Sequence, residues 1–322
     1  MKRALLLFSG GLDSILAGKL LQKQGFEVVA LRFITPFFGW QWKGREEEFK
    51  SLVRKRYGFR GEVYDITPEY LKMLAAPRHG YGSGFNPCVD CKILMLRKAA
   101  ELQPLFQAQV LATGEVVGQR PMSQQRHTLR HIEKEAGLSR KILRPLSAKK
   151  LPPTEYEEAG LVDRDQLLAI AGRGRKEQLA LAEDLGLQEI PSPAGGCLLT
   201  DPSLAPRIRR FFELKGGAVS PREAELLTFG RHIFLSSGGW LVLGRKEAEN
   251  KRLLSLVQWG DIVFDLEGIP GPTGLLLFKR SPQDLEEAAR WLKRYAPKAR
   301  GQEKVQVRVV YWDQGEEEKI VV

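Results

Sequence analysis

The sequence contains very few cysteines. Cys88, Cys91 and Cys197 are the only three among 322 residues. Small secreted domains that depend on disulfides carry a dense and even-numbered set of cysteines. The sequence therefore implies no secreted disulfide framework, and the cysteines have either a structural role or a role in metal binding or sulfur chemistry.

Long apolar runs are also absent. The segment MKRALLLFSGGLDS has two basic residues and a run of five apolar residues, which is too short for the core of a signal peptide. No stretch reaches the roughly 18 uncharged apolar residues that a membrane-spanning helix needs. We therefore expect a cytoplasmic protein that makes no membrane contact.

Two common nucleotide-binding fingerprints are missing. The sequence has no G-x-x-x-x-G-K-[ST] motif, which excludes a Walker-type NTPase. No G-x-G-x-x-G follows a predicted strand, so a dinucleotide-binding fold would lack its phosphate-binding turn.

Negative charge is the scarcer sign. The 50 Lys and Arg outnumber the 39 Asp and Glu, which gives a net charge of +11 and a pI near 9.5. A chain this basic usually binds a polyanion, although the same excess can serve solubility alone. The apolar fraction of 43% is ordinary for a globular protein, and 322 residues fit two or three domains.

Strands and helices alternate in the first part of the chain. Apolar runs predict strands at 4–8, 27–33, 62–66 and 109–113, and helical spacing predicts helices at 12–24, 45–57 and 90–101. This alternation predicts an α/β unit with a parallel sheet and helices on both faces. Further helices are expected at 164–171, 175–185 and 204–214.

The pattern changes near residue 217. Short strands are expected at 232–235, 240–243, 262–264, 274–278 and 305–311, with helices at 247–257 and 283–295. We therefore predict two domains, residues 1–216 and a smaller α+β domain at 217–322. The acidic stretch 316–318 stands out only as a biased segment.

The segment Ser9–Ser14, SGGLDS, connects the first predicted strand to the first predicted helix. Glycines let backbone N–H groups approach an anion, the serines add hydroxyl donors, and the helix N-terminus adds the positive end of its dipole. Asp13 is placed to hold Mg²⁺ against phosphates. A plain turn with a serine cap is the simpler alternative.

All three cysteines are expected in loops rich in Gly and Pro. Cys88 follows the irregular stretch GYGSGFNP, which we expect to be mobile, and Cys91 lies one helical turn later. Cys197 lies in the loop 191–202, 106 residues after Cys91. Three readings stay open: a zinc site that lacks a clear fourth ligand, a redox pair with a catalytic persulfide, and a [4Fe-4S] cluster held by three thiolates.

Basic residues gather in several segments. Between residues 120 and 150, nine Lys and Arg face only Glu133 and Glu135. Such a run suits contacts to a phosphate backbone, with a solvated helix face as the alternative. The candidate RNA-binding residues are Arg120, Arg126, Arg130, Arg207, Arg209, Arg210, Arg231, Arg245 and Lys246.

The string SGGLDS resembles the PP-loop of the N-type ATP pyrophosphatases, which cleave ATP between the α and β phosphates and adenylate a substrate oxygen. The resemblance implies a doubly wound parallel sheet, with adenine near Leu31, Arg32 and Phe33. The ATP-binding residues implied or expected are Phe8, Ser9, Gly10, Gly11, Asp13, Ser14, Phe33, Thr113, Gly114 and Gln119.

Further motifs resemble tRNA thiolases within that group. Residues 86–92, NPCVDCK, look like the cysteine motif of the MnmA type. Residues 112–119, ATGEVVGQ, with Ser123-Gln124 and the segment 143–146, LRPL, look like the ThiI type. A C-x-x-C pair with one distant cysteine is similar to the iron–sulfur-dependent thiolases of the TtuA and TtcA types.

The C-terminal domain resembles another family. Gly230-Arg231-His232, the segment 243–250 (LGRKEAEN) and Pro270-Gly271-Pro272 look like an NFACT-type RNA-binding domain. This resemblance implies that the second domain contacts RNA.

Together these resemblances imply an ATP-dependent tRNA sulfurtransferase that forms 2-thiouridine or 4-thiouridine. The expected catalytic residues are Asp13, Cys88, Cys91 and Cys197, and the expected cofactors are ATP, Mg²⁺ and a [4Fe-4S] cluster held by the three cysteines. The expected partners are tRNA and a sulfur donor, either hydrosulfide, a cysteine desulfurase or a carrier protein. The oligomeric state stays open between a monomer and a homodimer.

Two other classes of function compete with this interpretation. A non-catalytic RNA-binding quality-control factor would explain the charge and the C-terminal domain, but not SGGLDS with three cysteines. A PP-loop enzyme for a small metabolite would explain SGGLDS, but not the C-terminal domain. Pyrophosphate release that depends on RNA separates the first from the thiolase, and salt-sensitive tRNA binding separates the second.

Overall fold

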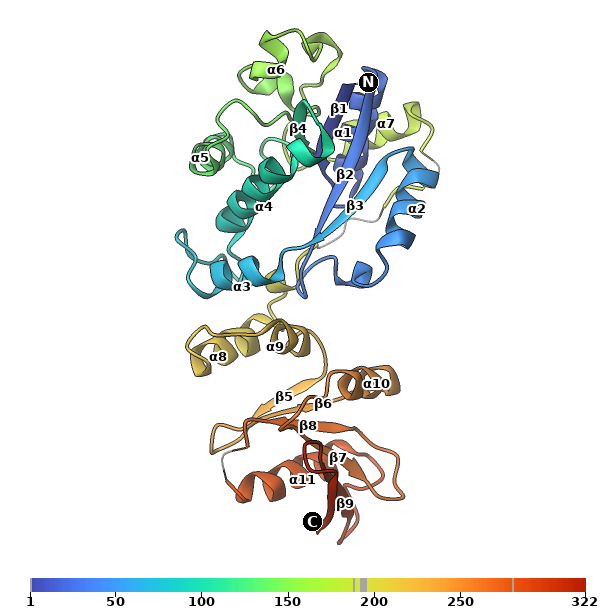
Figure 1. The fold of residues 1–322 in the computed structure, drawn as a ribbon, viewed down its shortest axis with the longest axis vertical. Helices are drawn as coiled ribbons and strands as arrows, with labels where there is room; N and C mark the ends of the chain where they lie inside the picture. Colours follow the sequence, from blue (N-terminus) through green and yellow to red (C-terminus); the bar gives the residue numbers. More distant parts are fainter. Residues whose placement is uncertain (1, 188, 192–195, 280) are drawn as a thin grey trace. The chain divides into compact units, whose positions relative to one another are not determined.

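The chain forms two compact units in the computed structural model. They are Met1–Pro206 and Arg207–Val322 (Figure 1). The structure describes residues 2–187, 189–191, 196–279 and 281–322. Part of the expected loop at 191–202, residues 192–195, lies outside the described residues.

The first unit is built on four parallel strands in the order β3-β2-β1-β4 (Figure 1). These strands are β1 (Lys2–Leu7), β2 (Phe26–Ile34), β3 (Arg60–Asp65) and β4 (Val110–Thr113). The strand order reverses at β1, which confirms the doubly wound α/β sheet. Ligands of such sheets bind beyond the carboxyl ends of the strands at this reversal.

Helices cover both faces of this sheet. On one face, Ile15 and Leu21 of α1 (Leu12–Lys23) share a core with Phe49 and Val53 of α2 (Glu46–Tyr57). The crossover from β3 to β4 contains α3 (Thr67–Ala75) and α4 (Cys88–Leu102). Because such crossovers are right-handed, it returns over the opposite face, and Figure 1 shows α2 and α4 on opposite sides of the strands.

Shorter elements complete the first unit. The remaining helices are α5 (Arg126–Ala136), α6 (Glu155–Glu158) and α7 (Lys176–Asp184). Single 3₁₀ turns are η1 (Trp40–Trp42), η2 (Pro104–Phe106), η3 (Ala148–Lys150), η4 (Arg164–Gln166) and η5 (Leu198–Thr200).

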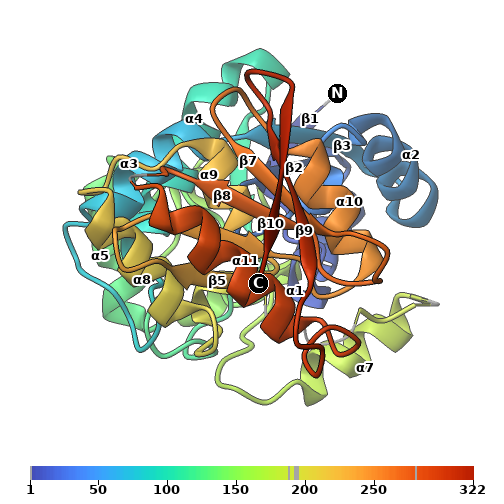
Figure 2. The same ribbon diagram turned by 90° about the horizontal axis from the view of Figure 1, so that it is seen from below.

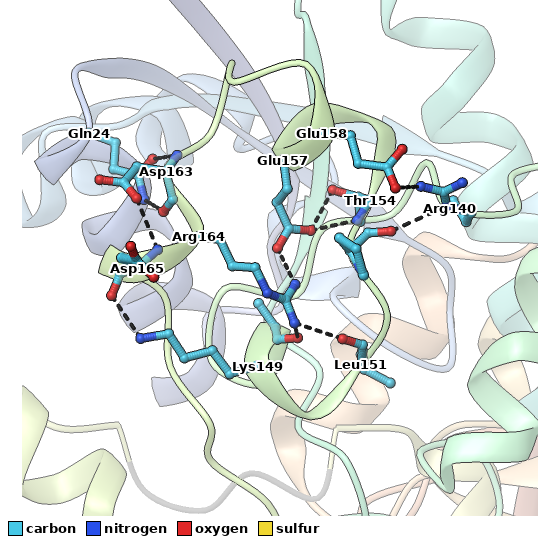
Figure 3. Close-up of polar contacts among 12 residues, drawn as sticks. Gln24, Arg140, Lys149, Leu151, Thr154, Glu157, Glu158, Asp163, Arg164 and Asp165 are labelled. Carbon is cyan, nitrogen blue, oxygen red and sulfur yellow. Dashed lines mark hydrogen bonds and ion pairs between the residues drawn. The ribbon is translucent and has the colours of Figure 1, made fainter.

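The predicted helix at 164–171 is wrong. Only η4 forms there, and the backbone beyond it is extended, with the N–H of Ile170 donating to Leu146 O at 2.8 Å. Figure 3 shows the Arg164 guanidinium turned toward Glu157 and toward the carbonyl of Leu151, which holds the segment in place. Apolar spacing alone did not distinguish a helix from an extended segment that pairs with another loop.

The second unit contains an antiparallel sheet of six strands in the order β10-β9-β7-β8-β6-β5. The strands are β5 (Arg231–Phe234), β6 (Trp240–Leu243), β7 (Ile262–Leu266), β8 (Gly274–Leu277), β9 (Gln306–Tyr311) and β10 (Glu316–Val321). Helix α11 (Gln283–Tyr295) packs Leu285 and Leu292 against Phe264 and Val309 (Figure 2). This arrangement confirms an α+β second domain.

Three more helices belong to this part of the chain. They are α8 (Ala205–Leu214), α9 (Pro221–Leu226) and α10 (Glu247–Ser255). The ring of Phe211 in α8 lies 4.2 Å from the ring of Trp240 in β6. This contact associates α8 with the second unit, although the change in sequence pattern falls after the helix.

Strand β10 was missed by the sequence pattern. It is an edge strand paired with β9, and its residues 316–319 are all charged and exposed. Charged edge strands avoid pairing with other chains, and they lack the alternating apolar pattern that reveals a half-buried strand. Within the part of the chain that the structure describes, no helix is both long and apolar enough to cross a bilayer.

Candidate active site

The SGGLDS segment forms a tight turn between β1 and α1. Gly10 adopts a left-handed conformation with φ 75°, and Gly11 precedes the first residue of α1. Ser14 Oγ donates to Gly11 O at 2.7 Å, and the N–H of Gly11 donates to Ser9 Oγ at 3.3 Å. These contacts hold the loop open at the N-terminus of the helix, where an anion is favoured.

The loop after β4 lies against this turn. A Cβ atom on Gly114 would fall 2.5 Å from the backbone N of Ser14, so only glycine fits there. Gln119 Nε2 donates to Asp13 Oδ2 at 3.0 Å. The structure thus brings together two predicted ATP-binding segments that are about a hundred residues apart in sequence.

The two aromatic candidates lie in the core. Phe8 is buried, and its ring lies 6.0 Å from the rings of Tyr57 and Phe59. Phe33 is likewise buried in β2. Any contact of these two residues with a nucleotide would therefore come from their backbone.

The three cysteines surround Tyr70. Cys88 and Cys91 lie in the first turn of α4, Cys197 precedes η5, and all three are free thiols. Burial, followed by the neighbouring cysteines, raises the pKa of Cys91 to about 12. Burial is also the main cause that raises the pKa of Cys197 to about 11. The hydroxyl of Tyr70 interacts with both thiols.

The loop 80–87 joins the cysteine segments. Asn86 Nδ2 donates to Cys88 Sγ at 3.1 Å, and the N–H of Phe85 donates to Leu199 O at 3.1 Å. The N–H of Leu198 donates to Phe37 O at 2.9 Å, beyond the carboxyl end of β2. A Cβ on Gly84 would lie 2.5 Å from Leu199 O, which explains a glycine at this position. The cysteines therefore lie at the same sheet edge as the SGGLDS turn.

A buried ion network supports this edge. Glu115 pairs with Lys92 at 3.2 Å and with Arg144 at 3.1 Å, and Arg144 also pairs with Glu133. Burial alone would raise the pKa of Glu115, but Lys92 and Arg144 outweigh it and hold the pKa below its usual value. Arg144 belongs to the basic run at 120–150, but it is buried and its charge serves the interior.

Sequence reasoning did not single out several of these residues. Tyr70 lies in an ordinary amphipathic helix, and its sequence context carries no signal for a contact with distant cysteines. Asn86 and Lys92 flank the cysteines inside the NPCVDCK motif, and Glu115 lies inside ATGEVVGQ. Their positions within quoted motifs were the signal that could have identified them.

Among residues 2–187, 189–191, 196–279 and 281–322, no three His, Cys, Asp or Glu side chains are arranged around a single metal ion. Asp13 Oδ1 is buried, and it has no hydrogen-bond partner in the described part of the chain.

The basic run has members of two kinds. Arg120, Arg126 and Arg130 are exposed, and the positive charge of Arg120 lies close enough to Cys197 to favour its thiolate. By contrast, Arg140 pairs with Glu158 and Lys149 Nζ donates to Asp165 O (Figure 3). The contacts of Arg140 and Lys149 hold the segment around α6 and η4 in place.

The second unit holds the remaining RNA-binding candidates. Arg207 donates to the carbonyls of Leu227 and Gly230, so its guanidinium fixes the segment before β5. Arg231 lies over the ring of Tyr295 at 4.8 Å, and Arg245 pairs with Glu249 at 2.6 Å. The exposed residues are Arg209, Arg210, Arg245 and Lys246.

Two family models match this chain. Residues 1–150 match "Thiamine biosynthesis protein (ThiI)", and residues 230–322 match "NFACT protein RNA binding domain". A probable tRNA sulfurtransferase of Moorella thermoacetica is 31% identical over 146 residues, covering 45% of this chain and 36% of that protein. One from Natranaerobius thermophilus is 31% identical over 165 residues, covering 50% and 39%.

The matched segments thus span less than two fifths of the length of these curated relatives. The solved structure of the U34-tRNA thiolase NcsA from Methanococcus maripaludis, with its [4Fe-4S] cluster, is 18% identical with a TM-score of 0.36. That alignment covers 70% of each chain, and a similarity at this level does not bear on the site. Residues 1–150 are thus similar to the ThiI family and residues 230–322 to the NFACT RNA-binding domain, the two families that the motifs resemble.

Proposed function

We propose that this chain is an ATP-dependent tRNA sulfurtransferase. The observation that carries the proposal is the meeting of two chemistries at one sheet edge: a phosphate loop closed by Gly114, and a centre of three thiols around Tyr70. The curated relatives, which are probable tRNA sulfurtransferases, support this assignment.

In the first step, a uridine carbonyl oxygen in tRNA attacks the α-phosphorus of ATP. The bond from that phosphorus to the bridging oxygen of the β-phosphate breaks, pyrophosphate leaves, and the uracil N3 proton is released. The backbone N–H groups of the Ser9–Ser14 turn and the N-terminus of α1 bind the phosphates and orient them. The unpartnered Asp13 Oδ1 fits a role as ligand of Mg²⁺, which would neutralise phosphate charge.

In the second step, a sulfur nucleophile attacks the activated ring carbon. The carbon–sulfur bond forms, the carbon–oxygen bond breaks, and AMP leaves with the former uridine oxygen. The proton of a hydrosulfide nucleophile is released, and N3 is reprotonated.

The thiols fit an iron–sulfur centre in their chemistry. Cys88, Cys91 and Cys197 are soft donors, and Cys88 contributes to raising the pKa of both Cys91 and Cys197. They would hold a [4Fe-4S] cluster, which supplies one iron that no protein thiolate occupies. Tyr70 and Asn86 would orient the sulfur atoms, which lie in half-buried positions. A persulfide carried by Cys91 or Cys197 is the alternative within the same function.

RNA binding is proposed for both units. Arg126 and Arg130 on the exposed side of α5 supply positive charge near the catalytic edge, and the NFACT-type domain supplies a second surface. Hydrosulfide, a cysteine desulfurase or a carrier protein would deliver the sulfur. A homodimer remains part of the expectation for the assembly.

The test is a reaction of the anaerobically purified chain with tRNA, Mg-ATP and sulfide. We expect formation of AMP and pyrophosphate that depends on tRNA, and a thiouridine in the digested RNA by mass spectrometry. Iron and acid-labile sulfide are measured on the same sample to separate the cluster from the persulfide. Absence of both AMP formation and thiouridine, in a chain that binds tRNA, would overturn the proposal in favour of a non-catalytic RNA-binding factor.

A further inference from the structure

Arg32 reaches from β2 over the phosphate loop. Its Nη1 donates to the carbonyl of Ser9, and a Cβ on Gly10 would lie 3.7 Å from the same nitrogen. On the other side, a Cβ on Gly39 would lie 3.1 Å from Arg32 Nε. The guanidinium is therefore enclosed between the Ser9–Gly10 backbone and the turn that follows β2.

This cation has no anionic partner. In the portion of the chain that is described, Arg32 forms no ion pair, and its Nε is buried without a hydrogen bond. Burial is the only cause acting on it, and lowers the pKa of Arg32 to about 10. Arg144 provides the contrast, because it is fully buried and lies between Glu115 and Glu133.

An unpaired buried charge is costly, because it loses hydration and gains no opposite charge in return. Such a group is stabilised when an anion binds beside it. Here the neighbouring backbone already favours an anion: Gly10 has φ 75°, and the N-terminus of α1 begins two residues later. Two independent sources of positive potential thus converge on one place.

We propose that Arg32 binds the pyrophosphate end of ATP and the pyrophosphate product. This inference deepens the proposed function and rests on it. It differs from the role that the PP-loop resemblance implies for residues 31–33, which is contact with adenine. A guanidinium matches two phosphate oxygens with parallel N–H groups, so a diphosphate suits it better than a single ester phosphate.

The charge of Arg32 would also act on the first chemical step, the departure of pyrophosphate. Negative charge accumulates on the bridging oxygen as the bond between the α-phosphorus and that oxygen breaks, and pyrophosphate takes the electron pair. A cation fixed at that place stabilises the leaving group without having to reorganise. Arg32 would therefore contribute to the rate of adenylation as well as to ATP affinity.

The test measures binding of inorganic pyrophosphate, ATP and AMP to the full chain by calorimetry. We compare the wild type with Arg32→Gln and Arg32→Lys, and use Arg60→Gln as a matched control because Arg60 lies on the adjacent strand and pairs with Glu62. Arg32→Gln should weaken pyrophosphate and ATP binding about 10- to 100-fold and leave AMP binding within about twofold. Arg32→Lys should recover part of the loss, and Arg60→Gln should bind like the wild type.

Thermal unfolding supplies a second readout. Without ligand, Arg32→Gln should melt at or above the wild-type temperature, because an uncompensated charge has been removed. Its stabilisation by pyrophosphate should be largely lost. A lower melting temperature combined with unchanged pyrophosphate affinity would overturn the proposal and assign Arg32 a purely structural role.

Different results would contradict the role of Arg32 and the sulfurtransferase function. If the wild type and Arg32→Gln bind pyrophosphate and ATP equally well, the role of Arg32 is wrong and the sulfurtransferase proposal stands. If the folded wild type binds neither ligand, then the ATP-dependent function fails, and the role of Arg32 fails with it.

Discussion

Asn86 donates a hydrogen bond from Nδ2 to Cys88 Sγ at 3.1 Å. The side-chain amide of Asn86 is fixed in this orientation, because its Oδ1 accepts a hydrogen bond from the N–H of Gly84 at 3.1 Å. A flipped amide would lose both hydrogen bonds. The side chain is buried, so the bond is shielded from competition with water. N–H donors to sulfur favour the charged thiolate and adjust the properties of any metal bound to it.

Replacement of Asn86 by Ala should therefore weaken the sulfur centre. We expect the anaerobically purified variant to lose iron to a chelator several-fold faster than the wild type, if a cluster is present, and unfolding stability to fall by about 1–2 kcal/mol. The control is Gln107→Ala, at an exposed position of the same unit. Equal iron loss in wild type and Asn86→Ala would show that the hydrogen bond does not act on the centre.

Thiol reactivity of the metal-free chain should depend on pH in an unusual way. Because the pKa of Cys91 is raised to about 12 and that of Cys197 to about 11, both thiols are protonated at neutral pH. Alkylation by iodoacetamide, which needs the thiolate, should be slow at pH 8 and rise about tenfold per pH unit until the chain unfolds. Mass spectrometry locates the modified residues, and the urea-unfolded chain provides the reference. Fast labelling of both residues at pH 8 in the folded chain would contradict the burial of these thiols.

Asp13→Asn should abolish ATP-dependent chemistry and keep the fold. The amide retains the shape and can still contact Gln119, but it removes the charge available to Mg²⁺. We expect AMP formation with tRNA to fall at least about 100-fold, while tRNA affinity stays unchanged. The melting temperature serves as the control for folding. Wild-type AMP formation by this variant would exclude Asp13 from the reaction.

His232 should make the second unit sensitive to acid. Burial, followed by the nearby Arg207, lowers the pKa of His232 from its usual 6.5 to about 3. Both ring nitrogens are engaged, since Nε2 donates to Phe229 O at 2.7 Å and Nδ1 accepts from Trp240 Nε1 at 3.2 Å. The unfolded chain therefore takes up a proton below about pH 6.5 that the folded chain refuses.

Protonation of His232 therefore destabilises the second unit as the pH falls. Stability is complete above pH 6.5 and falls by up to about 1.4 kcal/mol per pH unit as the pH drops toward 3. At pH 5 the loss attributable to His232 should be about 2 kcal/mol, measured by urea unfolding followed by tryptophan fluorescence. His232→Gln should lose this part of the pH dependence, whereas His127→Gln, at an exposed position, should keep it. Parallel pH profiles for His232→Gln and the wild type would contradict the prediction.

The exposed arginines of α5 should contribute to tRNA binding through phosphates. Arg126 and Arg130 form no ion pair within the described residues, and Leu129 and Ile132 bury the opposite side of the helix. Arg126→Ala with Arg130→Ala should lower the salt dependence of tRNA binding by about two counterions. Arg54→Ala with Lys55→Ala, on exposed positions of α2, is the control pair. An unchanged salt dependence would show that this side of α5 faces away from RNA.

The fold of the first unit could be predicted because local patterns coincide with tertiary structure. The run at 4–8 is apolar on both faces, as a central parallel strand requires, and SGGLDS marks the turn into α1. The segment 164–171 and strand β10 could not be predicted, because backbone pairing with distant segments decides their conformation. The apolar side chains of 164–171 have a spacing that is typical of a helix, and those of β10 show no alternation typical of a strand.

The candidate site divides in the same way. Motifs predicted the SGGLDS turn and the cysteines as candidate site residues, since the pattern of each lies in consecutive residues. The contact of Gly114 with Ser14, the position of Tyr70 among the thiols and the enclosure of Arg32 depend on segments that meet only in the folded chain. In the basic run at 120–150, charge alone does not distinguish exposed residues from buried ones. Arg144 has the same charge as its neighbours, but it is buried and pairs with Glu115.

The hydrogen bond from Phe85 to Leu199 has a consequence for the order of biosynthesis. Cys88 and Cys91 leave the ribosome 106 residues and more before Cys197. At a typical rate of synthesis, about 5–20 residues per second, the first two thiols wait roughly 5–20 seconds for the third. During that interval a nascent chain presents only a C-x-x-C pair, which is open to stray metals and to oxidation. Any centre that needs all three thiols can therefore assemble only after Cys197 has been synthesised, and a chain cut before Cys197 would keep only the C-x-x-C pair.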